Sequence, residues 1–420
     1  MLKVSLITIG DEIRIGQIIN TNAAWLSNEL TRLGVFVSKH ITIGDDFELM
    51  IEVINEQIRH NDFVITTGGL GPTHDDITKP VLLKIFNDEL IEDKTTINYL
   101  EEFFRTRNWA LTERNRQQSL VPSKAKLLPN KIGTAPGLLF EKEGKYIISL
   151  PGVPSEMKYI TTNSILPLIK QKMEEKNENV VLYKTLNVAG IFESNLADLI
   201  GNPNIFLGEK SSLAFLPSYQ GIKLRIGTIQ DNFEFAKKEI ERIRKILYDK
   251  AGSYIWSEDK ENLAEVLGQL LLQEKKTLSV AESCTGGWLG REITAVAGSS
   301  EYFLGGIISY SNEVKINQLK VSKETIERYG AVSQQTAFEM AKNVREIFSS
   351  NYSIAITGIA GPSGGTVDKP VGTVWIGLAT EDNVQTFNYN FGNERSINRE
   401  RAVGTSLLLL LQAIKNNKKL

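Results

Sequence analysis

Short apolar runs alternate with amphipathic helical patterns through the first 170 residues of the chain. Apolar runs bounded by glycine, proline or polar residues predict buried strands at 4–9, 35–43, 63–67 and 146–150. Apolar residues at helical spacing predict helices at 22–33 and 47–58, and 95–121 has the polar, helical character of an insertion. Because strands alternate with helices, we expect a mostly parallel sheet covered by helices.

Two further modules follow the first one. Strand patterns at 180–188 and 222–229, with a Lys- and Glu-rich amphipathic helix at 233–249, predict a small α+β module. Beyond residue 257 an α/β pattern returns, with strands expected at 277–281, 306–310 and 352–357 and an antiparallel pair at 373–379 and 384–391. The predicted α/β architecture therefore has three domains, at 1–170, 171–256 and 257–420.

The composition excludes several classes of function. The 420 residues carry a formal net charge of −2, which offers no support for binding to nucleic acid or to an anionic membrane. The single cysteine, Cys284, excludes a disulfide framework and a zinc site built from cysteines. The longest apolar run, 407–411, is far shorter than the ~20 residues of a membrane span, and the chain shows no secretory start. We therefore expect a cytoplasmic protein with no membrane partner.

The segment 281–287 carries the strongest candidate chemistry. It follows a predicted strand, precedes a helix, and combines two candidate nucleophiles, Ser283 and Cys284, with backbone N–H groups suited to an oxyanion. The three histidines are His40, His60 and His74, so a general base in this half of the chain has to be Lys, Glu, Asp or Tyr. Lysine accepts a proton once burial lowers its pKa, and Ser–Lys pairs are an established catalytic solution.

Lys315 is the best-placed lysine for that role. Tyr310 is predicted to end a strand, and Lys315 follows one turn into the next helix. If that strand lies beside the strand before Ser283, both side chains reach the sheet edge where ligands of open α/β sheets bind. The third predicted strand delivers Thr357 and Gly358 to the same edge. The pattern therefore predicts a nucleophile and a base that act together on a carbonyl group.

The motifs of this half resemble the nicotinamide-nucleotide amidase domain. The resemblance rests on the segments 281–287, 310–315, 330–333, 358–362 and 369–374, which span 257–420 in order and with compatible spacing. It implies that nicotinamide mononucleotide is hydrolysed to nicotinate mononucleotide and ammonia without a cofactor, with Ser283 as nucleophile and Lys315 as base assisted by Tyr310. The implied substrate-binding residues are Glu282, Cys284, Thr285, Gly286, Gly287, Thr357, Gly358 and an arginine that meets the phosphate, Arg395 or Arg399.

A glycine-rich turn follows the predicted strand at 63–67. Glycines let a backbone approach a phosphate closely, and a helix N-terminus favours its charge. Nearby carboxylates are candidates to hold Mg²⁺ or a similar divalent metal against that phosphate. The predicted phosphate-binding residues are Gly68, Gly69, Leu70, Gly71, Pro72 and Thr73, and the predicted metal ligands are Asp75, Asp76, Glu12 and Asp45.

The N-terminal motifs resemble a molybdopterin-binding-type domain, in the variant found at the front of the CinA family (competence/damage-inducible protein A). They lie at 10–12, 16–22, 67–78, 128–137 and 150–156, and 187–196 fits the middle module of that family. The resemblance implies a three-layer α/β/α fold and metal-dependent cleavage of ADP-ribose to AMP and ribose 5-phosphate. Asp75 stands where molybdopterin-handling proteins carry arginine, and the extra carboxylate suits a metal-bound pyrophosphate.

Three hypotheses follow for the whole chain. The first is a homodimeric hydrolase of pyridine-nucleotide salvage with two activities, one on nicotinamide mononucleotide and one on ADP-ribose. The second is a binding protein without catalysis, either a molybdopterin carrier or a partner in competence or DNA repair. The third is a chain in which one domain has lost its activity and only binds ligand. Within the first hypothesis, Cys284 is the alternative nucleophile to Ser283.

Overall fold

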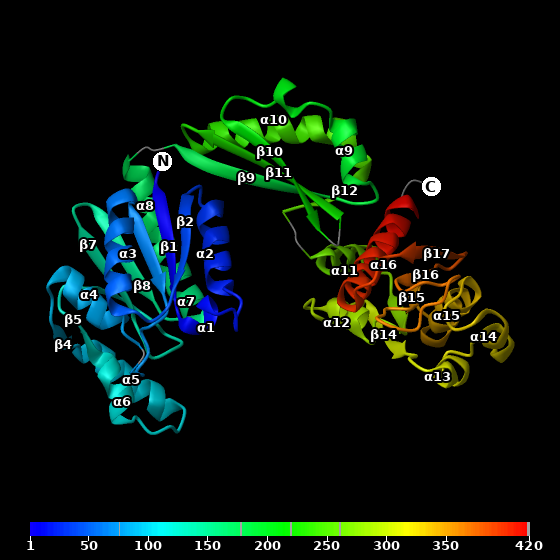
Figure 1. The fold of residues 1–420 in the computed structure, drawn as a ribbon, viewed down its shortest axis with the longest axis horizontal. Helices are drawn as coiled ribbons and strands as arrows, with labels where there is room; N and C mark the ends of the chain where they lie inside the picture. Colours follow the sequence, from blue (N-terminus) through cyan, green and yellow to red (C-terminus); the bar gives the residue numbers. More distant parts are fainter. Residues whose placement is uncertain (75, 177–178, 219–220, 260–261, 418–420) are drawn as a thin grey trace. The chain divides into compact units, whose positions relative to one another are not determined.

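The computed structural model describes the chain up to residue 417, apart from residue 75 and the pairs 177–178, 219–220 and 260–261. The chain forms two compact units. One comprises 1–184, 203–213 and 226–246, and the other comprises 185–202, 214–225 and 247–420. The strands belong to three larger sheets, which Figure 1 shows, and to one small two-stranded sheet.

The N-terminal sheet contains six strands, most of them parallel. Their order is β2 (Phe36–Ile43), β1 (Lys3–Ile9), β3 (Phe63–Thr67), β8 (Lys145–Leu150), β7 (Gly137–Lys142) and β6 (Lys126–Leu128). The first four strands run parallel, whereas β7 and β6 form antiparallel pairs. All five residues of β3 are buried, which explains why its sequence shows no alternation of apolar and charged residues.

Helices cover both faces of this sheet. Phe63 and Ile65 of β3 belong to one buried cluster, together with residues of α2 (Thr21–Arg32) and α7 (Pro154–Ile160). Val64 points the other way and packs with residues of α3 (Phe47–His60) and α4 (Thr78–Phe86). The two clusters on opposite faces make the predicted three-layer α/β/α fold, which Figure 1 displays.

The remaining N-terminal elements include the insertion predicted at 95–121. It is mainly the amphipathic helix α5, which buries Leu100, Phe103 and Phe104 in a small cluster of their own. These elements are α1 (Asp11–Arg14), β4 (Leu90–Glu92), α5 (Lys94–Thr106), α6 (Glu113–Arg116), η1 (Gln117–Ser119), β5 (Leu120–Pro122), η2 (Thr161–Ile165) and α8 (Leu166–Lys176).

The sequence pattern missed the antiparallel edge of this sheet. β7 returns against β8 through a tight turn at Glu143 and Gly144, whose φ angles are both positive at 54° and 73°. This backbone twist is typical of two-residue hairpins, and glycine adopts it without strain. The prediction of one strand at 146–150 was therefore incomplete, because its hairpin partner was left unassigned.

The middle module is a four-stranded sheet with two helices, in agreement with the predicted α+β class. The strand order is β10 (Ser211–Ser218), β11 (Gly221–Gln230), β9 (Val180–Val188) and β12 (Ile255–Glu258). Its other elements are α9 (Glu193–Ile200), η3 (Pro203–Ile205), α10 (Phe233–Ala251) and η4 (Gly252–Tyr254). Apolar residues of α10 at helical spacing are buried, namely Ala236, Ile240, Ile243 and Leu247.

The C-terminal sheet has five strands with parallel pairs in its first half. The order is β14 (Phe303–Ile308), β13 (Leu278–Glu282), β15 (Tyr352–Gly358), β16 (Thr373–Ala379) and β17 (Val384–Asn390). The predicted antiparallel pair β16–β17 is present. The helical elements are α11 (Leu263–Glu274), α12 (Trp288–Thr294), η5 (Ser299–Glu301), α13 (Asn312–Asn317), α14 (Lys323–Tyr329), α15 (Gln334–Phe348) and α16 (Arg395–Asn417).

Register places three strand ends together. β13 lies between β14 and β15 and is parallel to both, and its last residue, Glu282, is paired with Ile308 of β14 and Ile356 of β15. Ser283 therefore emerges between the ends of two neighbouring strands, as the sequence predicted.

One boundary was predicted wrongly. β14 spans Phe303–Ile308, so Tyr310 does not end that strand. The chain turns earlier because the side chain of Ser311 accepts a hydrogen bond from the N–H of Val314 and caps α13.

Within the described part of the chain, even the long helix α16 falls short of the apolar length that would cross a membrane.

Candidate functional site

Ser283 and Lys315 meet at the carboxyl edge of the C-terminal sheet. Ser283 directly follows β13, and Lys315 is the fourth residue of α13. The amine Nζ of Lys315 lies 3.0 Å from the hydroxyl Oγ of Ser283 and donates a 2.7 Å hydrogen bond to the carbonyl of Ser309. Both side chains are buried, with 8% of Ser283 and 1% of Lys315 exposed. This is the geometry of a nucleophile beside its base.

Burial prepares the amine of Lys315 for that role. It lowers the pKa of Lys315 to about 8, because the protonated amine loses its hydration. The carbonyl of Ser309 holds one N–H of the amine, which leaves the lone pair of its neutral form available to the hydroxyl of Ser283. Sequence reasoning missed Ser309, because its contribution comes from a backbone carbonyl that no side-chain pattern reveals.

Glu282 stabilises the turn through hydrogen bonds and is not part of the contact between Ser283 and Lys315. Its buried carboxylate accepts hydrogen bonds from the backbone N–H groups of Gly287 (3.0 Å), Leu289 (3.0 Å) and Gly290 (2.8 Å). The first N–H groups of a helix lack partners within the helix, and negative charge at that end is favourable. Glu282 therefore fixes the start of α12 to the end of β13.

The turn between β13 and α12 requires its glycines. Gly286 and Gly287 have φ angles of 61° and 94°, a region that side chains disfavour. Cys284 lies in the same turn with 7% of its surface exposed, and burial raises the pKa of its thiol to about 11. Because the thiolate is the reactive form of cysteine, little of it exists near neutral pH. These observations favour Ser283 over Cys284 as the nucleophile.

The two candidate arginines contact different groups. Arg395 donates hydrogen bonds to the carbonyl of Gly361 (2.9 Å) and to the hydroxyl of Tyr310 (3.1 Å). Arg399 donates a 2.7 Å hydrogen bond to the carbonyl of Thr285, which places it at the nucleophile turn. Within the described residues, Nε of Arg399 and Oγ1 of Thr285 are buried without a hydrogen-bond partner. Buried polar atoms without partners are uncommon, and a polar ligand would satisfy both.

The other predicted residues lie at the same sheet edge. Tyr310 is 61% exposed, and the partner of its hydroxyl is Arg395 rather than the candidate base. Thr357 is buried and donates a 2.7 Å hydrogen bond to the carbonyl of Ala331. Gly358 is the last residue of β15. Thr357 therefore anchors a neighbouring loop, and assistance by Tyr310 stays a prediction.

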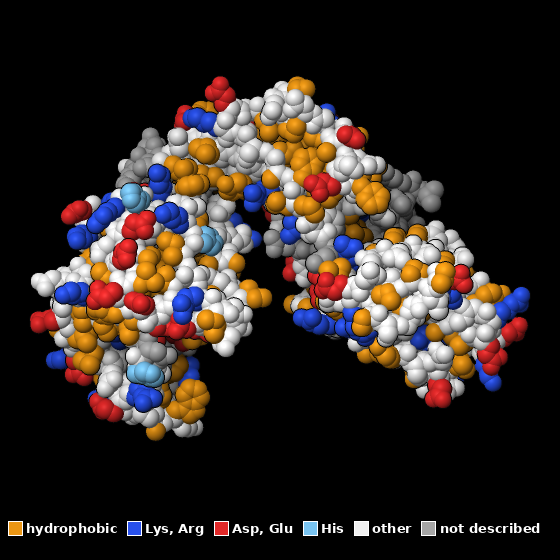
Figure 2. Space-filling model, in the orientation of Figure 1, with side chains coloured by type: hydrophobic (Ala, Val, Ile, Leu, Met, Phe, Trp, Pro, Cys, Tyr) orange, Lys and Arg blue, Asp and Glu red, His pale blue; other side chains and the backbone are white. Residues whose placement is uncertain are grey.

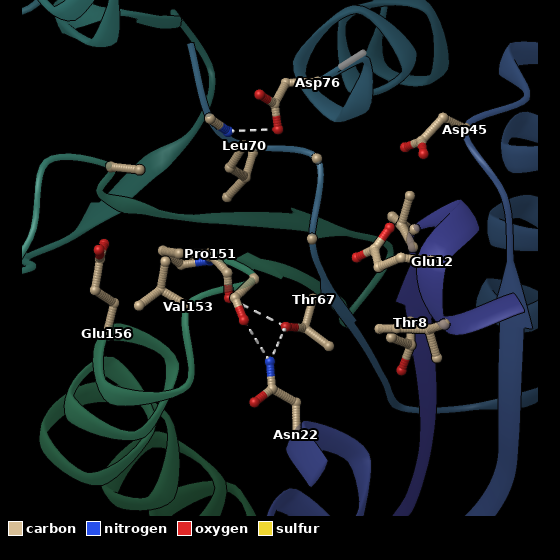
Figure 3. Close-up of a pocket in the computed structure, with 18 of the residues that line it drawn as sticks. Thr8, Glu12, Asn22, Asp45, Thr67, Leu70, Asp76, Pro151, Val153 and Glu156 are labelled. Carbon is tan, nitrogen blue, oxygen red and sulfur yellow. Dashed lines mark hydrogen bonds between the residues drawn. The ribbon is translucent and has the colours of Figure 1, made fainter. Parts of the chain in front are cut away.

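A cavity of about 380 Å³ lies at the carboxyl edge of the N-terminal sheet, and Gly68, Gly69, Leu70, Gly71 and Pro72 form part of its wall. Gly68 has a φ of 115°, and a side chain there would meet the carbonyl of Ile9 at 2.2 Å, so only glycine fits. Figure 3 shows Glu12 and Asp45 on one side of this cavity and Glu156 on the other.

Asp76 shapes the glycine turn. Its carboxylate accepts hydrogen bonds from the N–H of Gly71 (2.8 Å) and the N–H of Thr73 (2.9 Å), and a third from the hydroxyl of Thr73. The bond to Gly71 is drawn in Figure 3. Both carboxylate oxygens are thus engaged in closing the turn. The other predicted carboxylate of this motif, Asp75, lies outside the described residues.

Glu12, Asp45 and Asp76 are the predicted metal ligands that line the cavity. Among the residues that the structure describes, which omit Asp75, no three His, Cys, Asp or Glu side chains are grouped so as to hold a metal ion. Mg²⁺ commonly takes one or two carboxylates and completes its shell with water and substrate phosphate oxygens. Glu12 and Asp45 fit that mode of binding, in which a phosphate supplies further ligands.

Sequence reasoning assigned no role to Glu156, Asn130 and Asn22. Burial raises the pKa of Glu156, whose Oε2 accepts a 2.5 Å hydrogen bond from Asn130. Asn22 donates hydrogen bonds to the hydroxyl of Thr67 (3.2 Å) and the carbonyl of Gly152 (2.8 Å). In the described structure, its Oδ1 is buried without a partner, as suits a ligand hydroxyl. All three lie in recognised motifs, but the motifs do not indicate which side chains face inward.

Three family profiles match successive parts of the chain. The profile described as "Probable molybdopterin binding domain" matches residues 5–171. The profile "Damage-inducible protein CinA KH domain" matches 183–257, and "CinA C-terminal domain" matches 260–414.

Full-length relatives show the same organisation. The chain is 38% identical to a CinA-like protein of Cytophaga hutchinsonii, over 97% of this chain and 96% of that protein. It is 39% identical to a CinA-like protein of Flavobacterium psychrophilum, over 99% of both. Among solved structures, a competence/damage-inducible protein of Agrobacterium tumefaciens is 37% identical and covers 36% of this chain and 93% of its own, with a TM-score of 0.36.

The role of Glu282 in the turn can be tested by Glu282→Gln. The change removes the negative charge and one acceptor from the three N–H groups at the start of α12. We expect it to lower the opening free energy of β13 and α12 by about 2–3 kcal/mol. Hydrogen exchange of these amides in the full chain measures that quantity. Glu313→Gln, an exposed change in the first turn of α13, should cost under about 0.5 kcal/mol; equal protection in both variants would contradict the assignment.

Proposed function

The chain belongs to the CinA family, and from that premise we propose that its C-terminal domain hydrolyses the amide of nicotinamide mononucleotide to nicotinate mononucleotide and ammonia. The observation that carries the proposal is the 3.0 Å contact between Nζ of Lys315 and Oγ of Ser283. A buried serine beside a lysine of lowered pKa is an arrangement that performs acyl transfer without histidine.

The proposed reaction proceeds through an acyl-enzyme. Neutral Lys315 takes the proton of Ser283 as Oγ attacks the amide carbon, and N–H groups of the turn that are not bonded to Glu282 would stabilise the developing oxyanion. The protonated amine then gives its proton to the leaving nitrogen, so that the C–N bond breaks and ammonia departs. Water loses a proton to Lys315 and attacks the acyl carbon. The bond between that carbon and Oγ then breaks, Lys315 returns the proton to Oγ, and nicotinate mononucleotide leaves.

Arg399 is the better candidate for the substrate phosphate. Its guanidinium lies at the turn that carries Ser283, and its Nε has no protein partner among the described residues. Both outer nitrogens of Arg395, in contrast, are engaged with protein oxygens. Arginine binds phosphate through several N–H groups in a fixed plane, so an unpaired Nε is suited to that ligand.

Substitution of the two neighbouring nucleophile candidates distinguishes them. We expect Ser283→Ala to lower ammonia release from nicotinamide mononucleotide at least about 10³-fold, because the attacking oxygen is lost. Cys284→Ser conserves shape and should retain activity within about threefold, since a buried thiol of raised pKa takes no part. A coupled assay for ammonia measures both. Activity that survives Ser283→Ala would eliminate the serine mechanism.

The pH profile tests the base. Lys315 acts in its neutral form, and that form becomes more abundant as pH rises through its pKa of about 8. We expect kcat/KM for ammonia release to rise about tenfold per pH unit well below pH 8 and to level off above it. Lys315→Arg should abolish activity because arginine stays protonated, whereas Lys323→Arg, on the surface of α14, should leave the profile unchanged. A flat profile through this range would refute Lys315 as the base.

We infer that the N-terminal domain cleaves ADP-ribose, with water attacking one phosphorus and the pyrophosphate P–O bond breaking to give AMP and ribose 5-phosphate. The support is a cavity that combines a glycine turn with carboxylates at its walls. Glu12 and Asp45 would hold Mg²⁺, which would neutralise phosphate charge when bound. Glu156, which lines the same cavity and has a pKa raised by burial, would accept the proton of the attacking water.

Metal dependence tests this second activity. The double variant Glu12→Gln and Asp45→Asn should raise the Mg²⁺ concentration needed for half-maximal AMP formation at least about tenfold, because two charged ligands become neutral. Ammonia release from nicotinamide mononucleotide should not change. Glu48→Gln, an exposed change on α3, serves as the matched control. An unaltered Mg²⁺ requirement in the double variant would exclude these two carboxylates.

A further inference from the structure

A second cavity, of about 460 Å³, lies next to the cavity of the glycine turn. Thr134 lines both cavities, so they meet at this residue. Neither the sequence motifs nor the proposed chemistry assigns a role to the second cavity. Its walls come largely from α5, the helix of the insertion, and from the segment 127–136.

The exposed surface of the second cavity is largely apolar. Tyr99, Leu127, Pro129 and Pro136 supply aromatic, aliphatic and proline ring surfaces. The hydroxyl of Tyr99 donates a 3.1 Å hydrogen bond to the carbonyl of Gly133, which holds the ring in place. A fixed aromatic ring among apolar walls is suited to stacking with a planar ligand, because every heteroaromatic base has a π face.

Hydrogen bonds hold the wall that separates the two cavities in place. Asn130, which is buried, donates hydrogen bonds to the carbonyl of Ala135 (2.9 Å) and to the carboxylate of Glu156 (2.5 Å), and its Oδ1 accepts one from the N–H of Ile132 (3.2 Å). The segment 130–135 is thereby closed into a short rigid loop that carries Thr134. A rigid wall at this place keeps both cavities open in the absence of ligand.

The second cavity can be placed relative to the acidic residues of the first cavity. Figure 3 shows Glu12 and Asp45 on the side of the first cavity opposite Glu156. Because Glu156 is bonded to Asn130, which lines the second cavity, the second cavity lies on the Glu156 side of the first cavity. A ligand that spans both would present its phosphates to the glycine turn and a planar group to Tyr99.

We propose that the second cavity is the base subsite of the N-terminal domain, in which Tyr99 stacks on the purine of a nucleoside diphosphate whose phosphates lie at the glycine turn. This inference rests on the proposed cleavage of ADP-ribose and adds its orientation. The adenosine half lies toward Tyr99, and the ribose 5-phosphate half lies toward Glu12 and Asp45. Specificity for the base then resides in the insertion that carries α5.

Binding of two product molecules to the full chain tests the subsite. AMP carries the base and ribose 5-phosphate does not. Calorimetric titration with Tyr99→Ala should show about tenfold weaker AMP binding and unchanged binding of ribose 5-phosphate. Tyr99→Phe retains the ring and should bind AMP within about threefold of the unsubstituted chain. Asn98→Ala, an exposed change on the same helix, is the control.

A second variant covers the case in which Tyr99→Ala disturbs the insertion. Thr95 is exposed at the rim of the second cavity, so Thr95→Trp should fold and fill the space of the base. It should weaken AMP binding at least about tenfold and leave ribose 5-phosphate binding unchanged. AMP binding that is unaffected by both variants, or that is absent in the unsubstituted chain, would overturn the subsite.

Hydrolysis separates this inference from the proposed function. If ADP-ribose with Mg²⁺ is not cleaved but AMP binding depends on Tyr99, the subsite is supported and the proposed pyrophosphatase activity is contradicted. If the unsubstituted chain and the variants Tyr99→Ala and Thr95→Trp all cleave ADP-ribose equally well, the proposed activity is supported and the subsite is contradicted.

Discussion

A lysine amine buried beside uncharged oxygens is the constraint on which the C-terminal site depends. The partners that the structure gives to Nζ of Lys315 are the hydroxyl of Ser283 and the carbonyl of Ser309. Removing a cation from water is costly unless an opposite charge compensates it, and the cost appears as a lowered pKa. The same cost makes Lys315 a usable base. A carboxylate in the place of the Ser309 carbonyl would stabilise the cation and remove that property.

Glu282 shows how the fold keeps negative charge away from this amine. It precedes Ser283 directly, yet its carboxylate is committed to three N–H groups at the start of α12. Side chains alternate between the faces of a strand, so neighbours at the end of β13 point in different directions. The charge of Glu282 therefore supports the helix start, and the hydroxyl of Ser283 faces Lys315.

The carboxylates of the N-terminal domain also differ in their surroundings. Asp76, Glu12 and Asp45 all line the cavity, and the carboxylate of Asp76 also closes the glycine turn through hydrogen bonds. Glu156 stands apart, buried beside Asn130. In both domains the parallel strands bring their carboxyl ends to one edge, and local hydrogen bonds then hold polar groups in place there.

The sequence alone determined the elements that depend on local pattern. β3 was predicted to the residue, because a continuous apolar and β-branched run between breakers leaves few alternatives. The bounds of β9 were also predicted correctly. The absence of histidine beyond residue 74 restricted the general base of the C-terminal half to lysine, glutamate, aspartate or tyrosine. The hairpin of β7 was missed, because its turn depends on positive φ at Glu143 as well as Gly144.

Only the tertiary structure decided how the candidate residues are used. Ser283 differs from Cys284 in its contact with Nζ of Lys315 and in the raised pKa of the thiol, and Arg399 differs from Arg395 in its hydrogen-bond partners. Tyr310 is paired with Arg395, which lies 85 positions away in sequence. The physical reason is the same in each case. The charge state and the free hydrogen-bonding capacity of a side chain depend on the groups that surround it, and most of those groups come from distant segments that packing brings together.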